Sequence, residues 1–152
     1  MFLLNKRQLI SLVDVLVLDK VGTGGSRDVY LLNQDIEKVV KIERSFSVQN
    51  TIEYELWCQF SETLEGKKWL ARCYSRSDDG VSLVQERLEI IISTEDKRLP
   101  EKVPRFFTDL KVTNWGVDTK GNVKCCDYGS SILLQNNPWQ LKKADWWEMS
   151  HE

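Results

Sequence analysis

The chain has 152 residues, of which 41% are hydrophobic and 29% charged, and its formal net charge is −2. This composition is typical of a soluble globular protein, and the length is that of one domain rather than several. Binding to a nucleic-acid backbone requires an excess of positive charge on some face, so the overall charge gives no reason to expect a nucleic-acid partner. No apolar run reaches the ~18 uninterrupted residues needed to cross a bilayer, so no membrane association is expected.

Cysteine usage and the first residues bear on the cellular compartment. The four cysteines show no Cys-x-x-Cys spacing and the chain has a single histidine, so neither a structural zinc site nor a disulfide framework is expected. Residues 2–13 fit either a short amphipathic helix or an added strand. Charges at positions 6, 7 and 14 interrupt this apolar opening, unlike a signal peptide. We therefore expect a cytoplasmic protein.

Two β-rich runs, residues 15–21 and 29–32, predict strands joined by a glycine-rich tip. The tip reads Gly22-Thr23-Gly24-Gly25-Ser26. Glycines at a hairpin tip let backbone N–H groups approach a phosphate without obstruction by side chains. Arg27 follows, and its cation is expected either to meet a phosphate or to point into water. The tip is a candidate phosphate site, with a plain hairpin as the alternative.

The next part of the chain predicts the rest of a sheet and one helix. Residues 38–42, 69–76 and 80–88 read as three further strands, the last two joined by a turn. Between them, apolar residues recur at helical spacing over residues 50–64, with Asn50 as the expected N-cap. Together with the first hairpin, these elements predict a five-stranded antiparallel sheet with one helix.

A lysine inside the third strand predicts a buried ion pair. Lys41 has apolar neighbours on both sides, so it needs an anionic partner. Two glutamates of the following helix compete for it. Glu53 is followed by apolar positions three, four and seven residues later, whereas Glu55 is not. If Lys41 pairs with a glutamate of this helix, we predict Glu53 as the partner and Glu55 as facing water; the alternative is an edge lysine with its charged head in solvent.

Four polar side chains of the segment 103–131 stand in an order that phosphoryl-transfer chemistry explains: Asp109, Lys111, Asn114 and Asp127. Two short apolar runs with a turn between them separate Asn114 from Asp127 and predict a hairpin. A carboxylate and a carboxamide at one end of such a hairpin can converge with a carboxylate leaving the other end. Oxygen ligands of this kind suit a hard cation, so the segment predicts a Mg²⁺ site.

At these residues the chain resembles the protein kinase-like superfamily. Asp109-Leu110-Lys111-x-x-Asn114 is similar to the second half of the kinase catalytic loop, and Asp127-Tyr128-Gly129 to the metal-binding Asp-Phe-Gly triplet. The glycine-rich tip resembles the kinase loop over the ATP phosphates, with Arg27 in place of the third glycine. The chain also departs from the family at Phe107-Thr108, where His-Arg is usual.

The resemblance implies a role for each candidate residue. Lys41, held by Glu53, would contact the α- and β-phosphates of ATP; Asp109 would orient the acceptor hydroxyl; and Lys111 would neutralise the γ-phosphate. Asn114 and Asp127 would hold Mg²⁺. Gln85 would lie beside the adenine. The remaining implied nucleotide contacts are Gly22, Gly24, Gly25, Val29 and the backbone of Glu86 and Leu88.

The fold implied is α+β and protein kinase-like, a single domain over residues 1–152. Residues 15–88 would form the small lobe, and residues 89–152 a catalytic-loop hairpin and a much reduced helical large lobe. The activation segment and substrate platform of the family are absent from the sequence. Trp139, Trp146 and Trp147 near the end of the chain are expected to be packing residues that close the shortened lobe.

Two functions follow, with a third alternative. The first is a minimal ATP-dependent kinase that phosphorylates a protein hydroxyl. The second is a catalytically weak or inactive kinase-like binding protein that inhibits or modulates a partner, such as a phage factor acting on a host enzyme or defence system. The third is a small interaction domain in which the motifs occur by chance.

Overall fold

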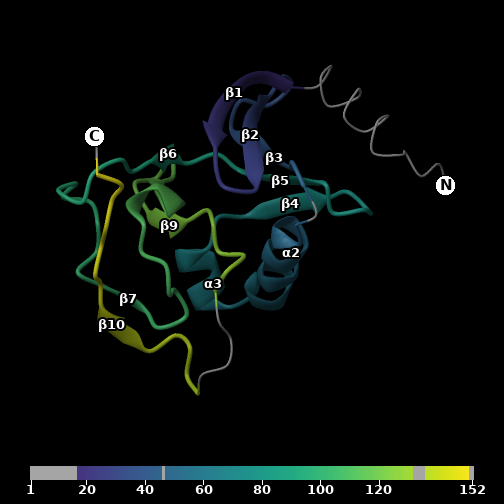
Figure 1. Ribbon diagram of the computed structural model, residues 1–152. Helices are drawn as coiled ribbons and strands as arrows, with labels where there is room; N and C mark the ends of the chain where they lie inside the picture. Colours follow the sequence, from purple (N-terminus) through teal and green to yellow (C-terminus); the bar gives the residue numbers. More distant parts are fainter. Residues whose placement is uncertain (1–16, 46, 132–135, 151–152) are drawn as a thin grey trace. The chain divides into compact units, whose positions relative to one another are not determined.

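The computed structural model describes residues 17–45, 47–131 and 136–150 (Figure 1). The predicted alternatives for residues 2–13 therefore lie outside the described residues. The chain divides into two compact units, which we call unit 1 (residues 1–55 and 72–87) and unit 2 (residues 56–71 and 88–152). In the described ranges, no helix combines the length and the apolar character that crossing a membrane requires.

Unit 1 is built on a five-stranded antiparallel sheet, as the sequence predicts (Figure 1). Its strands lie in the order β1-β2-β3-β5-β4, so that the last two change places relative to the chain. The strands are β1 (Val17–Thr23), β2 (Arg27–Leu32), β3 (Lys38–Glu43), β4 (Cys73–Arg76) and β5 (Ser82–Glu86). The sheet and its single long helix give the mixed α+β class that the sequence indicates.

Helix α2 (Gln49–Phe60) begins and ends earlier than its apolar spacing predicts. Asn50 is not its N-cap, because Asn50 lies inside the helix and its buried side chain bonds to other parts of unit 1. The helix stops at Phe60, where the hydroxyl of Thr63 donates to the Phe60 carbonyl oxygen at 2.7 Å. The same hydroxyl accepts from the N–H of Gly66, so Thr63 also caps the next helix, α3 (Leu64–Trp69).

The fourth strand was expected to begin at residue 69, but Trp69 is the last residue of helix α3 and β4 begins only at Cys73. Gly66 is the residue that permits this helix to follow α2 so closely. A Cβ atom at Gly66 would lie 2.0 Å from the Phe60 carbonyl oxygen, well inside contact distance. Glycine therefore allows a backbone approach that no other residue could make.

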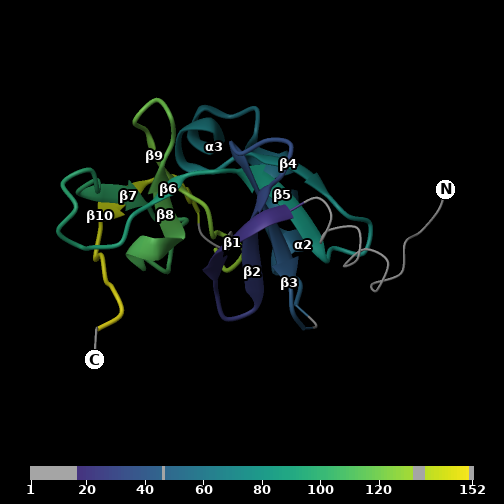
Figure 2. The same ribbon diagram turned by 90° about the horizontal axis from the view of Figure 1, so that it is seen from above.

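Residues 89–150 contain strands where a reduced helical lobe was expected, and this prediction is wrong for the described residues. A three-stranded sheet has the order β6-β8-β9, and β7 pairs with β10 (Figures 1 and 2). The elements are β6 (Glu89–Ile90), β7 (Lys102–Pro104), the 3₁₀ helix η1 (Val112–Asn114), β8 (Trp115–Val117), β9 (Val123–Cys125) and β10 (Leu141–Lys143). All three prolines of the chain fall in this stretch, at positions 100, 104 and 138, and each disfavours a helix interior at its own position.

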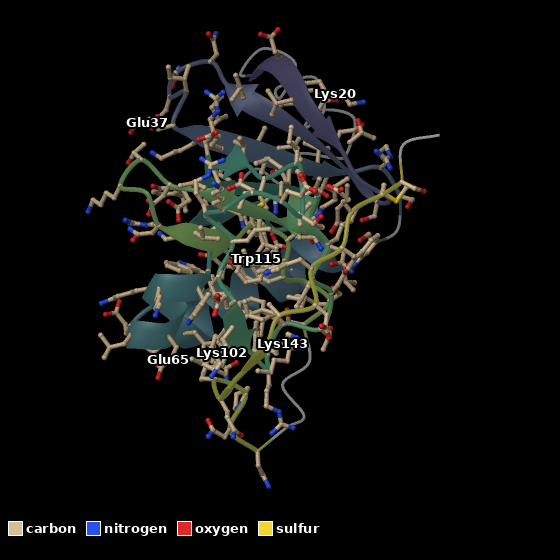
Figure 3. All side chains as sticks on the ribbon, turned by 90° about the vertical axis from the view of Figure 1, so that its left-hand side faces the viewer. Lys20, Glu37, Glu65, Lys102, Trp115 and Lys143 are labelled. Atoms are coloured by element: carbon tan, nitrogen blue, oxygen red, sulfur yellow. The ribbon has the colours of Figure 1, made fainter. Side chains whose placement is uncertain are left out.

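Aromatic side chains form the core of unit 2. Trp115 and Phe106 are completely buried, and Figure 3 shows Trp115 inside, with the labelled charged side chains of this unit at its surface. Trp139 stacks on Phe106 with ring centroids 4.9 Å apart, and Trp146 meets Trp115 edge-on at 5.1 Å. The prediction of packing tryptophans is confirmed for these two. It is wrong for Trp147, which is 43% exposed.

Candidate functional site

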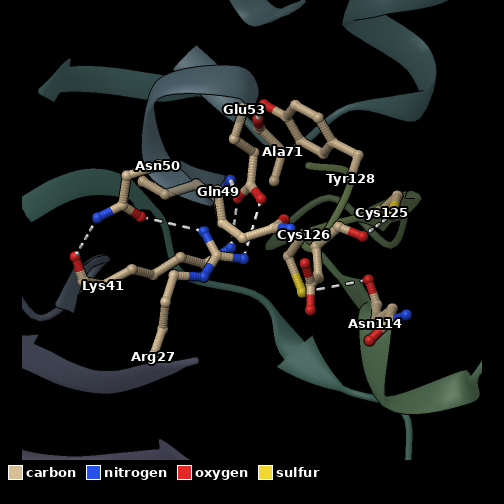
Figure 4. A network of polar contacts seen from close by, with 12 residues as sticks. Arg27, Lys41, Gln49, Asn50, Glu53, Ala71, Asn114, Cys125, Cys126 and Tyr128 are labelled. Carbon is tan, nitrogen blue, oxygen red and sulfur yellow. Dashed lines mark hydrogen bonds and ion pairs between the residues drawn. The ribbon is translucent and has the colours of Figure 1, made fainter. Parts of the chain in front are cut away.

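The predicted ion pair between β3 and α2 is present in unit 1. Lys41 Nζ lies 2.6 Å from Glu53 Oε1, and the two side chains are 6% and 0% exposed (Figure 4). Glu55, the competing glutamate, faces outward and is exposed. The apolar neighbours of Lys41 indicated that it needs an anion, and the helical spacing of α2 favoured Glu53 over Glu55.

Arg27 joins the same carboxylate, which the sequence did not predict. Its guanidinium donates from Nη2 to Glu53 Oε2 at 3.0 Å and from Nη1 to Asn50 Oδ1 at 3.1 Å (Figure 4). Arg27 is 6% exposed, so the expectation that it might point into water is wrong. Each oxygen of Glu53 thus holds one cation.

Two amide side chains complete this network, which we call the Glu53 cluster (Arg27, Lys41, Asn50, Glu53 and Gln85). Asn50 Nδ2 donates to the Lys41 carbonyl oxygen at 3.1 Å, which ties the helix to β3. Gln85 Nε2 donates to Glu53 Oε1 at 3.1 Å, and its place beside an adenine stays a prediction. Polar residue type alone gave no signal that Asn50 and Gln85 would both be fully buried.

The electrostatics of the cluster keep Glu53 ionised. Burial raises the pKa of this carboxyl, but the charges of Lys41 and Arg27 and their hydrogen bonds outweigh burial and bring the pKa below the ordinary value of 4.5. A buried carboxylate is stable only with such compensation. The cluster is therefore a charged core in which Lys41 is held in one place.

The glycine-rich tip lies between β1 and β2, where it was predicted. Gly24 and Gly25 are exposed, and a Cβ atom at Gly25 would meet nothing within 4 Å. The N–H of Gly24 donates to the Arg27 carbonyl oxygen at 2.8 Å, so this donor is satisfied within the hairpin. Gly22 and Val29 are paired across the two strands. The glycines of the tip are thus accessible to solvent, but the backbone N–H of Gly24 is already used within the turn.

The two backbone positions expected at the adenine edge fall in different units. In unit 1, the N–H of Glu86 donates to the Arg72 carbonyl oxygen, and Glu86 Oε1 accepts from the N–H of Arg72, both at 2.8 Å. In unit 2, Leu88 is 6% exposed, with its side chain in the interior. Their role toward a nucleotide stays a prediction.

In unit 2 the predicted hairpin and loop are present. Strands β8 and β9 pair in register, and Gly121 in the turn between them has a φ of 86°, a conformation that favours glycine. Asp109 in the loop before them is exposed, and its two carboxylate oxygens receive different donors. Oδ1 accepts from the N–H of Lys111 at 3.2 Å, and Oδ2 accepts from Asn114 Nδ2 at 3.3 Å.

The chain before Asp127 is tied to Asn114. The N–H of Cys126 donates to the Asn114 carbonyl oxygen at 2.8 Å, and Tyr128, the residue after Asp127, is fully buried with its hydroxyl donating to the Ala71 carbonyl oxygen (Figure 4). Asp127 itself is half-buried. Its neighbours on both sides are thus fixed, which holds Asp127 in the vicinity of Asn114.

This donor set suits Mg²⁺ better than a metal that needs a complete protein cage. Among the described residues, no three His, Cys, Asp or Glu side chains form a metal-binding group. Mg²⁺ is commonly held by one or two protein oxygens, with phosphates and water supplying the rest. Asn114 uses its amide nitrogen toward Asp109, which directs its amide oxygen elsewhere. The role of Asn114 and Asp127 as ligands of a nucleotide-bound Mg²⁺ stays a prediction.

Trp147 contacts the loop in a way that the sequence did not predict. Its indole Nε1 donates to Asp109 Oδ1 at 3.0 Å, although 38 positions separate them in the chain. It was expected to be a packing residue, and no motif marked it. Only the pairing of the chain's last part with the loop brings the two residues together.

Comparisons with known proteins give a likeness to solved structures only. No protein family model matches the chain, and no curated protein matches it. Among the solved structures, the chain is similar to one in the streptomycin–ATP–APH(2″)-IIa ternary complex, at 16% sequence identity and a TM-score of 0.44. The match covers 66% of this chain and 35% of that chain, so this chain spans well under half the length of that relative.

Proposed function

We propose that the chain is a minimal ATP-dependent phosphotransferase of the protein kinase-like superfamily, with residues 1–152 acting as one kinase-like domain. The observation that carries the proposal is the buried pair of Lys41 and Glu53. Burying two opposite charges costs several kcal/mol of desolvation each, and an apolar pair of the same shape is often as stable. A buried lysine held at one point therefore favours a task in binding an anion over a task in stability.

In the proposal, unit 1 binds the nucleotide. Lys41 contacts the α- and β-phosphates while Glu53 fixes its position. The glycine-rich tip approaches the phosphates, since its exposed glycines present no side chain. The residues assigned to the nucleotide are Gly22, Gly24, Gly25, Val29 and Lys41, with the backbone of Glu86 and Leu88 at the adenine edge.

Unit 2 supplies the metal ligands and the acceptor side of the reaction. Asn114 and Asp127 hold Mg²⁺, which would neutralise charge on the phosphate oxygens. Asp109 receives the proton of an acceptor hydroxyl on a protein, and the acceptor oxygen forms a bond to the γ-phosphorus. The bond from that phosphorus to the bridging oxygen breaks, and ADP leaves. Lys111 offsets the charge on the transferred group.

A second candidate is a kinase-like protein that binds and modulates a partner without turnover, such as a phage factor acting on a host enzyme or defence system. Arg27 favours this candidate, because it shares Glu53 with Lys41 and so gives the Glu53 cluster a structural use. The strands found over residues 89–150 favour it too, because the described part of this stretch contains no α-helix that could serve as a substrate platform.

One pair of variants separates the two candidates. Asp127→Asn should lower the affinity for ATP measured in the presence of Mg²⁺, because an amide is a weaker ligand for a hard cation than a carboxylate. Asp109→Asn should retain this affinity and lower ADP release by the ~10²–10⁴ typical of a lost general base. Binding is measured by thermal shift, since ligand at a hundredfold excess over Kd adds about 2.7 kcal/mol of stability.

Three results decide the outcome. The absence of any Mg²⁺-dependent shift of the wild-type protein at millimolar ATP would exclude both candidates. Binding without ADP release, or release that Asp109→Asn leaves unchanged, would exclude the phosphotransferase and leave the binding protein. Transfer of label from γ-labelled ATP to a protein in lysate, lost in Asp109→Asn, would support the kinase and identify its acceptor.

A further inference from the structure

The carboxylate of Asp109 is held by a residue from the far end of unit 2. Trp147 Nε1 donates to Asp109 Oδ1 at 3.0 Å, and the N–H of Lys111 donates to the same oxygen at 3.2 Å. Asn114 Nδ2 donates to Oδ2 at 3.3 Å. A carboxylate has about four lone-pair directions, so these three donors leave one direction on Oδ2 for an incoming proton. The arrangement selects a single orientation of the carboxylate.

The backbone of Trp147 is fixed to the same loop. Its N–H donates to the Leu110 carbonyl oxygen at 3.1 Å, and its carbonyl oxygen accepts from the N–H of Val112 at 2.9 Å. These two bonds form a parallel bridge between Trp147 and Lys111. The indole therefore does not reach Asp109 from a loose chain end, because the main chain on which it stands is paired with the residues that follow Asp109.

The ring of Trp147 also lies against the second charged residue of the loop. Lys111 Nζ is 5.7 Å from the centre of the ring, within the range of a cation–π interaction. One side chain thus contacts both Asp109 and Lys111, through its N–H and its face respectively. A tryptophan can do this at low entropic cost, since it has only two side-chain torsions to fix.

The neighbouring tryptophan shows what a purely structural role looks like here. Trp146 donates its indole N–H to the Pro100 carbonyl oxygen at 2.9 Å and packs its ring on buried Trp115. Trp147 instead directs its N–H to a carboxylate and remains 43% exposed. Stability of the core does not require a donor at Asp109, which is itself exposed.

We propose that Trp147 is a positioning residue for phosphoryl transfer, which orients the carboxylate of Asp109 through its indole N–H and holds Lys111 beside it. This inference rests on the proposed function, because the orientation matters only where Asp109 receives the acceptor proton. During the transfer the acceptor oxygen bonds to the γ-phosphorus, the bridging P–O bond breaks, ADP leaves, and the proton passes to Asp109. Trp147 touches none of the reacting atoms and acts through Asp109.

Trp147→Phe tests the role, because phenylalanine keeps an aromatic face and lacks only the donor. The probe is Mg-ATP, and the measurement is release of ADP as the γ-phosphoryl group passes to water or to a hydroxyl of the protein itself. We expect kcat to fall about tenfold, the magnitude of a lost hydrogen bond to a charged group, and KM for Mg-ATP to stay within about twofold. Trp146→Phe is the matched control: it should lower Tm and leave kcat within about twofold.

A double variant separates positioning from a general structural effect. In an Asp109→Asn background, Trp147→Phe should cause little further loss of kcat, because the residue through which it acts is already changed. Full additivity of the two losses would overturn the proposal. So would a Trp147→Phe protein with unchanged kcat, or one with raised kcat, which would show that the indole covers Asp109. Wild-type protein without turnover would overturn the proposed function before the variants are compared.

Discussion

Arg27 Nη2 lies 3.0 Å from Glu53 Oε2, while Lys41 Nζ lies 2.6 Å from the other oxygen of the same carboxylate. One buried anion thus neutralises two buried cations, one from β2 and one from β3. Asn50 accepts a further hydrogen bond from Arg27, and its own backbone N–H donates to Glu43 at 2.8 Å. The consequence is that Glu53 is a side chain on which both cations depend.

Glu53→Gln should therefore destabilise the protein strongly. The change leaves Lys41 and Arg27 buried without their shared anion, and breaking a buried ion pair from one side costs about 3–5 kcal/mol. Urea unfolding followed by circular dichroism measures the free energy of unfolding. Glu55→Gln is the matched control on the same helix and should change this free energy little, because Glu55 is exposed. Equal effects of the two variants would contradict the structure.

The lowered pKa of Glu53 predicts a loss of stability in acid. Its folded-state pKa lies below the ordinary value of 4.5, so the unfolded state binds the proton first as the pH falls. The stabilisation is complete above about pH 4.5 and is lost as the pH falls through the folded-state pKa. The free-energy difference between wild type and Glu53→Gln should thus be constant near neutral pH and shrink below pH 4.5. A difference that grows in acid would contradict this sign.

The sequence predicted those parts of the structure that depend on local spacing. Apolar neighbours indicated that Lys41 needs an anionic partner, helical spacing placed Glu53 on the buried face, and turn residues located the β8–β9 hairpin. Arg27 was not predicted because arginine at a strand start is usually solvated, and its burial depends on Glu53, 26 positions away. Pairings of this kind carry no periodic pattern.

The boundaries of helices and the form of unit 2 were harder to predict. Apolar residues continue at helical spacing past Phe60, so the spacing predicted one longer helix. The Thr63 hydroxyl bonds to the last carbonyl of α2 and to the first turn of α3, and apolar spacing gives no sign of such a break. In residues 89–150, analogy with a larger fold predicted helices where prolines and short strands are found. The contact of Trp147 with Asp109 was missed because it depends on long-range pairing of the backbone.

Lys41→Met should separate nucleotide binding from folding. Glu53 keeps Arg27 as a partner in this variant, and methionine retains most of the lysine stem, so the protein should remain folded. If Lys41 contacts the α- and β-phosphates, the thermal shift caused by Mg-ATP should disappear. Circular dichroism checks the fold and the thermal shift checks the binding. A folded variant with an undiminished shift would remove Lys41 from the nucleotide site.

Arg27→Met should lower the stability of the fold and leave nucleotide binding intact, the opposite of the result expected for Lys41→Met. Arg27 is 6% exposed and has two partners in the Glu53 cluster, so its loss leaves Asn50 Oδ1 without this donor and Glu53 with one cation instead of two. We expect the free energy of unfolding to fall by about 3 kcal/mol or more, the range for a buried pair broken from one side. Arg98 is a suitable control, because it forms its ion pairs with Glu89 and Asp96 at the surface. Arg98→Met should leave the stability nearly unchanged. Lys41 keeps its 2.6 Å contact with Glu53 when Arg27 is absent, so Mg-ATP should still stabilise the variant. Loss of the nucleotide shift in a folded Arg27→Met protein would instead show that Arg27 contacts the phosphates, the first of the two roles that its place beside the glycine-rich tip suggested.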